Sequence, residues 1–330
     1  MHTYLLVDLA NTYFRARHSA HRASSIEEKV SFAIHVTLAS INKCWRDQHA
    51  DHVVIALEGR SWRKDFYKPY KANRAESRAL QTKAESEEDA LFWQGLDHLK
   101  DFLIQHTNCT VLHHPELEAD DLISGWISNH PQHQNIIVSS DTDFHQLLSE
   151  NTKQYNGVAD ELHTISGIYN SKNQLVIDKK TKQAKPAPNP DWILFEKCMR
   201  GDSTDNIFSA YPGVRTKGSK NKVGLLEAFQ DKTNKGFAWN NLMLQRWVDH
   251  DNVEHKVLDV YERNRTLIDL NHQPDNIKSK ITDTITNNSV SKKKPMIGPQ
   301  FLKFCGRHGL NRLSDQAQTF SEIFSASYSV

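Results

Sequence analysis

Short apolar strands alternate with helical segments along the first half of the chain, and this alternation limits the folds open to it. The strand candidates are "TYLLVD" (3–8), "HVVIALE" (52–58), "CTVLHH" (109–114) and "NIIV" (135–138). Between them, residues 26–46 and roughly 86–106 carry apolar side chains at helical spacing. Strands that alternate with helices indicate βαβ units and a parallel sheet. The sequence therefore predicts an α/β domain in this half.

Acidic side chains follow these strands at the points where the strands end. In an open parallel sheet the working site lies beyond the carboxyl ends of the strands, so we expect these acids to meet at one rim. Solvated acids that serve only solubility have no reason to choose strand ends. The set is Asp8, Glu58, Glu118, Asp120, Asp121, Asp141 and Asp143.

The segment "ELEADD" (116–121) concentrates four acids at the start of a predicted helix. The helix dipole favours one or two acids there, but four repel one another unless a positive charge lies between them. Carboxylates crowded without His or Cys suit Mg²⁺ or Mn²⁺. Two such ions can activate a water and stabilise the leaving oxygen in phosphodiester hydrolysis. Asp202 and Asp205, in "RGDSTDNIF", add a further pair.

Charge is sorted along the chain. Without the nine acids named above, the formal net charge of +1 would rise to +10, which fits an acidic metal site on a basic, phosphate-holding protein. Residues 60–83 hold eight Lys or Arg and two acids, with Trp62, Phe66, Tyr67 and Tyr70 among them. Basic residues interleaved with aromatics suit an unpaired nucleic-acid strand. A solvated helix, or a loop packed on the core, is the alternative.

The second half has a different pattern. "TKQAKPAPNP" (181–190) is typical of a linker, and from Asp191 the chain is predicted to be mostly helical, with turn-rich breaks near 211–222 and 286–298. "SAYPGVRTKGSKNKVGLLEAF" resembles a helix–hairpin–helix, whose backbone amides could hold a phosphate of duplex DNA. We expect one domain over 1–185, which includes the basic stretch at about 60–85, and a helical DNA-binding region over 186–330.

Composition excludes some classes of protein. No apolar run of 18 residues exists, so no membrane span is expected. The N-terminal segment has an Asp within its apolar run and favours a first strand over a signal peptide. The four cysteines are scattered without CxxC spacing, which favours buried or free thiols in a reducing cytoplasm.

Taken together, these motifs resemble the 5′-nuclease (flap endonuclease) family, and its phage branch in particular. The matching segments occur in family order over residues 3–310. They are "LLVDLANTYFRA", "YKPYKANR", "ELEADDLISGW", "VSSDTDFHQLL", "RGDSTDN" and "YERNRTLIDLNHQPDNI". The resemblance implies a parallel-sheet, PIN-like nuclease core with a helical arch, followed by a mainly helical region with a helix–hairpin–helix-like element.

The resemblance also assigns residue roles. It implies two Mg²⁺ ions, which Mn²⁺ can replace: a tighter site at Asp8, Glu58, Glu118 and Asp120 with Asp121 nearby, and a second at Asp141, Asp143, Asp202 and Asp205. Asp143 is also expected to be catalytic, and Lys71 and Arg74 match arch residues that meet the scissile phosphate. The expected nucleic-acid contacts are Tyr70, which can stack a base, and Arg63, Lys64, Gly213, Gly218 and Lys220.

Two positions depart from the family pattern. Glu58 stands where the family usually has Asp, so metal spacing or preference can differ. Thr216 replaces a hairpin glycine, which weakens the expectation of a phosphate or monovalent-cation site there.

The implied activity is Mg²⁺-dependent 5′→3′ exonuclease and 5′-flap endonuclease cleavage with ribonuclease H activity. It would remove RNA primers and adjacent DNA from lagging-strand fragments during phage DNA replication. Expected partners are DNA and RNA–DNA duplexes with 5′ ends or flaps, and a phage single-strand-binding protein or sliding clamp. We expect a monomer in the host cytoplasm. The alternatives are a PIN-like endoribonuclease, a catalytically inert DNA-structure binder and, less favoured because of the basic arch, a small-molecule phosphatase.

Overall fold

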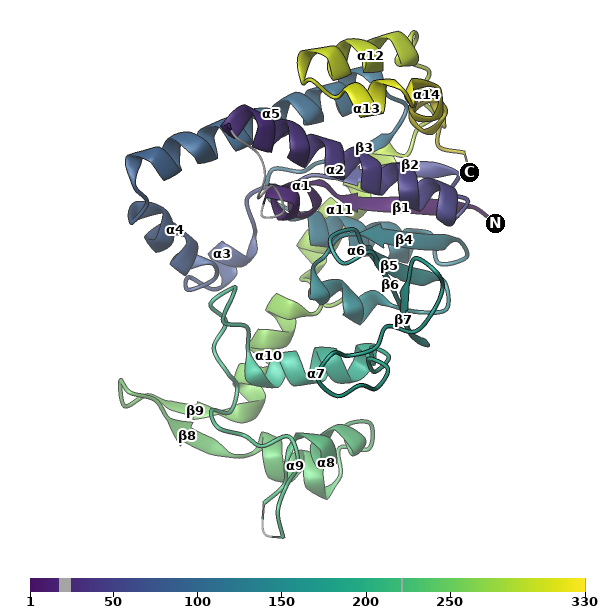
Figure 1. Ribbon diagram of the computed structural model, residues 1–330. Coiled ribbons are helices and arrows are strands. Elements are labelled where there is room, and N and C mark those ends of the chain that lie inside the picture. The colour runs from purple at the N-terminus through teal and green to yellow at the C-terminus, as the bar shows by residue number, and fades with distance from the viewer. Residues whose placement is uncertain (18–24, 221, 330) are drawn as a thin grey trace. The chain divides into compact units, whose positions relative to one another are not determined.

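Strands and helices alternate through the first half of the computed structural model, which describes residues 1–17, 25–220 and 222–329 (Figure 1). The strands of the main sheet are β1 (Thr3–Asp8), β2 (His52–Ala56), β3 (Thr110–Leu112), β4 (Gln134–Val138), β5 (Thr152–Asn156), β6 (Glu161–Thr164) and β7 (Gly167–Asn170). The helices among them are α1 (Leu9–Arg17), α2 (Ile26–Asp47), α5 (Lys83–His106), α6 (Ala119–Asn129) and the 3₁₀ helix η1 (Thr142–Leu147). The predicted α/β class is confirmed.

The sheet runs in the order β3-β2-β1-β4-β5-β6-β7. The first five strands are parallel, and β6 and β7 are antiparallel additions at one edge. Val7 of β1 lies level with Ile55 of β2 on one side and with Val138 of β4 on the other. The carboxyl ends of these three strands therefore meet at one rim.

Alternate residues of β1 face two different helical layers. Leu5 and Val7 belong to an apolar core with α2, α5 and the C-terminal helices α12 (Ile297–Arg307) and α14 (Ala317–Ser325). Tyr4 points to the other face, where its ring lies 5.2 Å from that of Trp126 on α6. Gly125 of the same helix lies against α11 (Asp275–Asn288) (Figure 1). Both faces are covered, as a parallel sheet requires.

The chain divides into two compact units. Unit 1 comprises residues 1–61, 81–188 and 276–330, and contains the sheet. Unit 2 comprises residues 62–80 and 189–275. The expected boundary at 185/186 divides the chain differently, because Phe301, Phe304 and Phe320 pack in the core of the sheet unit.

Unit 2 is built mainly of short helices. They are α3 (Arg63–Phe66), α4 (Ala72–Ala79), α7 (Pro190–Arg200), α8 (Leu225–Gln230), α9 (Phe237–Met243) and α10 (Val257–Ile268). The second half of the chain is mostly helical, as predicted, and its helices continue through α11, α12, α13 (Asn311–Ser314) and α14. The exception is a hairpin of two strands, β8 (Arg246–Val248) and β9 (Glu254–Lys256). Asp249 makes this turn by accepting the N–H groups of Asp251 and Val253.

No helix in the described part of the chain is long and apolar enough to cross a membrane.

Candidate functional site

The acids at the carboxyl ends of β1, β2 and β4 hydrogen-bond to neighbouring segments. Asp8 is buried at the end of β1, where Oδ1 accepts the N–H of Asn11 at 3.1 Å. Glu58, two residues beyond β2, accepts the N–H of Ala119 at 3.3 Å, which ties it to the start of α6. Asp141 begins η1 and accepts the N–H of Asp143 at 3.0 Å. Each acid is thus held by the backbone of the loop or helix that follows a strand.

Asp120, on the first turn of α6, interacts electrostatically with the other acids of the rim. Its pKa lies well above the ordinary value, first because burial disfavours the charged form. The other causes are the negative charges of Glu58, Asp8, Asp141 and Glu118, in that order. Acids from the ends of β1, β2 and β4 and from the start of α6 therefore share one electrostatic environment. A cation would relieve their mutual repulsion.

Ser139 links two of these acids, although nothing in the sequence singled it out. Its buried hydroxyl donates to Asp8 Oδ2 at 3.2 Å and accepts the N–H of Asp141 at 3.1 Å. Gln154 of β5 then fixes the same turn, because its Nε2 donates to the carbonyl oxygens of Ser139 and Asp141 at 2.9 and 2.6 Å. The adjacent serines in "VSSDTD" were the available signal, but their partners depend on the sheet order.

The "ELEADD" segment begins α6 with a capping box. Asp121 is fully buried and accepts the N–H of Glu118 at 3.2 Å, and Glu118 in return accepts an N–H from the first turn. Glu116, left out of the predicted site, pairs with Lys280 of α11. Trp126 of α6 is completely buried.

The rim acids supply only oxygen donors, which fits a hard divalent cation. Among the described residues, however, no three carboxylate, imidazole or thiolate groups converge tightly enough to hold a metal ion as they stand. The chemistry of the donor set fits a divalent metal ion.

Asp202 and Asp205 lie in unit 2, where each meets a cation. Burial, the largest single cause, raises the pKa of Asp202, but Lys197, whose Nζ lies 2.8 Å from Oδ2, and the backbone N–H groups of Thr204 and Asp205 together lower it. Asp205 lies 2.8 Å from Arg74 Nη2 and 3.6 Å from Lys71 Nζ. These two acids thus have different surroundings from those of Asp120, whose largest charge interactions are all with carboxylates.

The predicted arch residues lie in unit 2 and are only partly available to a ligand. Tyr70 is 4% exposed and donates its hydroxyl to Asp205, so its ring is not free to stack a base as predicted. Arg63 is 2% exposed, and its Nε donates to the carbonyl oxygen of Leu267 at 2.7 Å, so the predicted nucleic-acid contact is not available in this arrangement. Lys64 is exposed, and about half of the Arg74 side chain is accessible.

The predicted hairpin contains an amide nest that a carboxylate of the chain already fills. Gly218 N and Gly224 N both donate to Glu227 Oε2, at 3.0 and 2.9 Å. The pKa of Glu227 lies below its ordinary value, because the carboxylate accepts its own backbone N–H and those of Gly218 and Gly224. Gly218 therefore does not offer its amide to a phosphate in this structure.

The other hairpin positions have separate surroundings. Gly213 has a positive φ of 71° and an open side, and Lys220 is exposed. Thr216, which replaces a family glycine, accepts Arg200 Nη2 at 2.6 Å and so braces α7. Glu227 and Lys197 are residues that the sequence interpretation missed, although their partners are close in sequence. Glu227 is three residues from Gly224, in a capping box at the start of α8, and Lys197 is five residues from Asp202.

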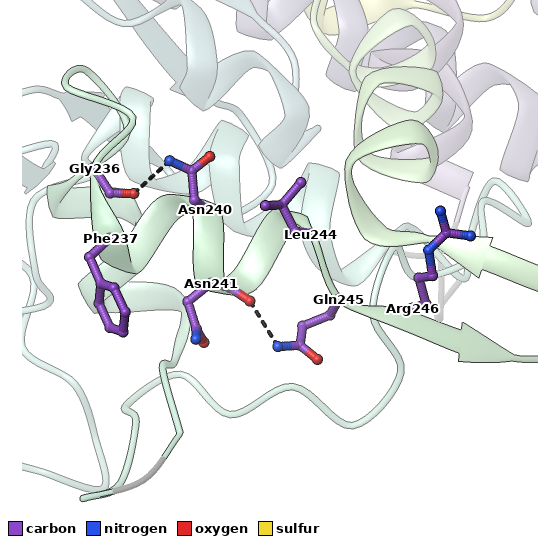
Figure 2. Close-up of a pocket in the computed structure, with 7 residues that line it drawn as sticks. All are labelled: Gly236, Phe237, Asn240, Asn241, Leu244, Gln245 and Arg246. Carbon is purple, nitrogen blue, oxygen red and sulfur yellow. Dashed lines mark hydrogen bonds between the residues drawn. The ribbon is translucent and has the colours of Figure 1, made fainter.

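A pocket of about 630 Å³ lies along α9 in unit 2 (Figure 2). Phe237, 81% exposed, and Leu244 line it together with polar side chains. Asn240 donates to the carbonyl oxygen of Gly236, and Gln245 donates to that of Asn241 (Figure 2). No predicted site residue lines this pocket, so it is separate from the acid rim.

A mostly parallel sheet with a carboxylate rim beyond its strand ends defines an α/β protein of the PIN-like, resolvase-like class. The profile of the 5′-3′ exonuclease N-terminal resolvase-like domain matches residues 3–182. The chain belongs to this family, whose members are nucleases, a class of phosphodiesterases.

Three other proteins are similar to this chain. Ribonuclease H of Enterobacteria phage T4 is 26% identical over 286 residues, 78% of this chain and 75% of that protein. DNA polymerase I of Chloroflexus aurantiacus is 25% identical over 224 residues, 66% of this chain; the chain spans only 21% of that polymerase. A structure of T5 5′-exonuclease with bound zinc shares the fold, with a TM-score of 0.60 and 18% identity over 87% of this chain and 99% of that one.

Proposed function

We propose that this chain is a divalent-metal-dependent nuclease that degrades strands from 5′ ends and cuts 5′ flaps, with ribonuclease H activity on RNA–DNA hybrids. The observation that carries the proposal is the shared negative field at Asp120, produced by acids from several strand ends in a member of a nuclease family. The T5 5′-exonuclease, which shares the fold, binds divalent metal ions. Similarity to T4 ribonuclease H supports the hybrid substrate.

The rim acids of unit 1 would hold Mg²⁺ or Mn²⁺: Asp8, Glu58, Glu118, Asp120, Asp121, Asp141 and Asp143. When bound, two divalent ions supply a nucleophilic water and offset charge on the leaving oxygen. A contribution from Asp202 and Asp205 stays a prediction, because both pair with cations in unit 2. The longer Glu58 side chain already reaches the start of α6, so its length does not keep it from the rim.

The chain's own cations would act on the phosphate. Lys71 and Arg74 are held beside each other by Asp205, and Arg74 keeps an accessible guanidinium. Fixed cations stabilise charge that develops on a transferring phosphoryl group. Lys64, Lys220 and the open backbone at Gly213 would contact substrate phosphates outside the reacting bond. Removal of RNA primers during phage replication in the host cytoplasm is the biological use that fits this activity.

The test is cleavage of end-labelled substrates in Mg²⁺, in Mn²⁺ and in EDTA. The substrates are a 5′ flap, a nicked duplex, an RNA–DNA hybrid and a single-stranded RNA. Asp143→Ala is the disabling variant, and Glu116→Gln is its matched control, because Glu116 lies in the acid cluster but pairs with Lys280. We expect short 5′ products that need metal and Asp143 and that persist in Glu116→Gln.

Each alternative predicts a different pattern of products. Binding of the flap without cleavage in either metal would refute the nuclease and leave a DNA-structure binder. Preferential cutting of single-stranded RNA, with the flap left intact, would favour the PIN-like endoribonuclease.

A further inference from the structure

A cavity in unit 1 is walled by segments that the function proposed above does not use. It measures about 590 Å³ and lies where the loop before α12 meets the end of α14. Lys293 and Lys294 come from the loop, Ser321 and Ser325 from α14, and Ser327 from the residues that follow. None of the described residues that line the cavity carries a carboxylate. Its wall therefore consists of cationic, hydroxyl and amide groups together with a few apolar side chains.

Hydrogen bonds across the cavity fix the wall in place. Asn108 accepts the N–H of Lys294 at 2.8 Å and donates from Nδ2 to the carbonyl oxygen of Ser325 at 2.7 Å. Ser327 donates to the carbonyl oxygen of Lys292. One asparagine and one serine thus join the lysine loop to the C-terminal segment. The site is organised without a ligand.

The positive charge at this wall has no partner in the described structure. Lys293 and Lys294 are exposed, and no described carboxylate forms an ion pair with either of them. The pKa of Lys292 is lowered, first by burial and in part by the charge of Lys294. The first-turn N–H groups of Ile297 and Gly298 face no capping side chain, because Met296 precedes them. An anion would satisfy all of these groups.

We infer that this cavity binds the phosphodiester backbone of the duplex part of the substrate, which makes the inference rest on the proposed function. Lys, Ser and Asn side chains and helix-terminal N–H groups are the donors that proteins use for DNA phosphates. The cavity is larger than a single phosphate ion, so it has room for a stretch of backbone. It would position the duplex through unit 1 and would read no sequence.

The experiment measures how DNA affinity depends on salt. A fluorescent 5′-flap duplex is titrated with the full chain in EDTA, because the substrate is not cut without metal. The titration is repeated at salt concentrations from about 50 to about 300 mM in ~50 mM steps, which determines the slope of log K against log salt. Each lost phosphate contact lowers the slope of log K against log salt by about 0.9, so Lys293→Ala with Lys294→Ala should lower it by about 1.8 and weaken binding. Lys303→Ala is the matched control, an exposed lysine of α12 outside the cavity.

The outcomes separate this inference from the proposed function. If the wild-type chain cuts the flap but the double variant keeps the slope and affinity of Lys303→Ala, the inference is overturned and the nuclease stands. Inorganic phosphate could shift the amide resonance of Gly298 while the double variant binds DNA as tightly as the wild type does. The cavity would then be a small-anion site, and the inference of backbone binding would be refuted. Absence of both cutting and flap binding in the wild-type chain would refute the proposed function itself.

Discussion

Replacing Ser139 by alanine should weaken metal binding without unfolding the protein. The substitution removes the hydroxyl that donates to Asp8 and accepts the N–H of Asp141. Asp8 then loses one of the groups that orient it, and the part-buried N–H of Asp141 loses its acceptor. Ser139 is a positioning residue in this argument, because it acts on the proposed metal through two carboxylates.

The size of the effect follows from these two contacts. A hydrogen bond to a charged group contributes about 1.5–3 kcal/mol. Loss of a group that orients a metal ligand typically lowers metal affinity about 10- to 100-fold, which corresponds to about 1.4–2.8 kcal/mol. The two ranges agree. We therefore expect the Mn²⁺ dissociation constant of Ser139→Ala to rise about 10- to 100-fold.

Isothermal titration with Mn²⁺ measures this effect without any substrate. Ser124→Ala is the matched control, since Ser124 is equally buried and its hydroxyl donates to a backbone carbonyl, that of Asp121, instead of a carboxylate. Ser124→Ala should lose about 1 kcal/mol of unfolding free energy and Ser139→Ala about 1.5–3 kcal/mol, because only Ser139 donates to a carboxylate. If Ser139→Ala and Ser124→Ala bind Mn²⁺ as the wild type does, the positioning role is refuted.

Two further predictions concern stability. A Cβ at Gly125 would lie 2.1 Å from Cγ2 of Ile281, so Gly125→Ala should lower the unfolding free energy, measured in urea, by about 1–3 kcal/mol. Gly306→Ala is the control, because a Cβ there meets nothing, and it should be neutral or raise the unfolding free energy by up to about 1 kcal/mol. Equal effects of the two substitutions would contradict this packing. Burial lowers the pKa of His52 to about 4, with a hydrogen bond to Ala326 opposing, so the unfolded chain binds a proton first as pH falls. The contribution of His52 to the unfolding free energy should then fall between pH 6.5 and 4, by about 2 kcal/mol from pH 7.5 to 5, and His52→Gln should make the total pH dependence less steep. An unchanged slope in that variant would assign the pH dependence to other groups.

The sequence predicted the sheet and its rim well because both depend on local patterns. "TYLLVD" is apolar throughout and ends in an acid, and a fully buried parallel strand needs no more than that. Topology alone could then place four acids at one rim: Asp8, Glu58, Glu118 and Asp141. The same four carboxylates interact electrostatically with Asp120, which agrees with this placement.

Sequence reasoning does not supply the partners that the folded chain gives to the predicted contact residues. Tyr70 and Arg63 looked like surface binders because they lie in a basic stretch, but Asp205 and the carbonyl oxygen of Leu267 hold them in unit 2. The hairpin glycines fitted a phosphate nest, yet Glu227 fills it. No local pattern encodes the contacts of Tyr70 and Arg63, which span more than a hundred residues, whereas Glu227 lies only three residues from Gly224 and was within reach of a local signal.

The order in which the two units are completed has a consequence for synthesis. Every residue of unit 2 precedes position 276, whereas unit 1 needs residues 276–330. During translation, unit 2 can therefore close on itself while the sheet still waits for Phe301 and Phe320, which cover one of its faces. A chain terminated after residue 275 would leave that apolar face open to water and prone to aggregation. Shortening the gene from its 3′ end would thus damage the sheet first and spare unit 2.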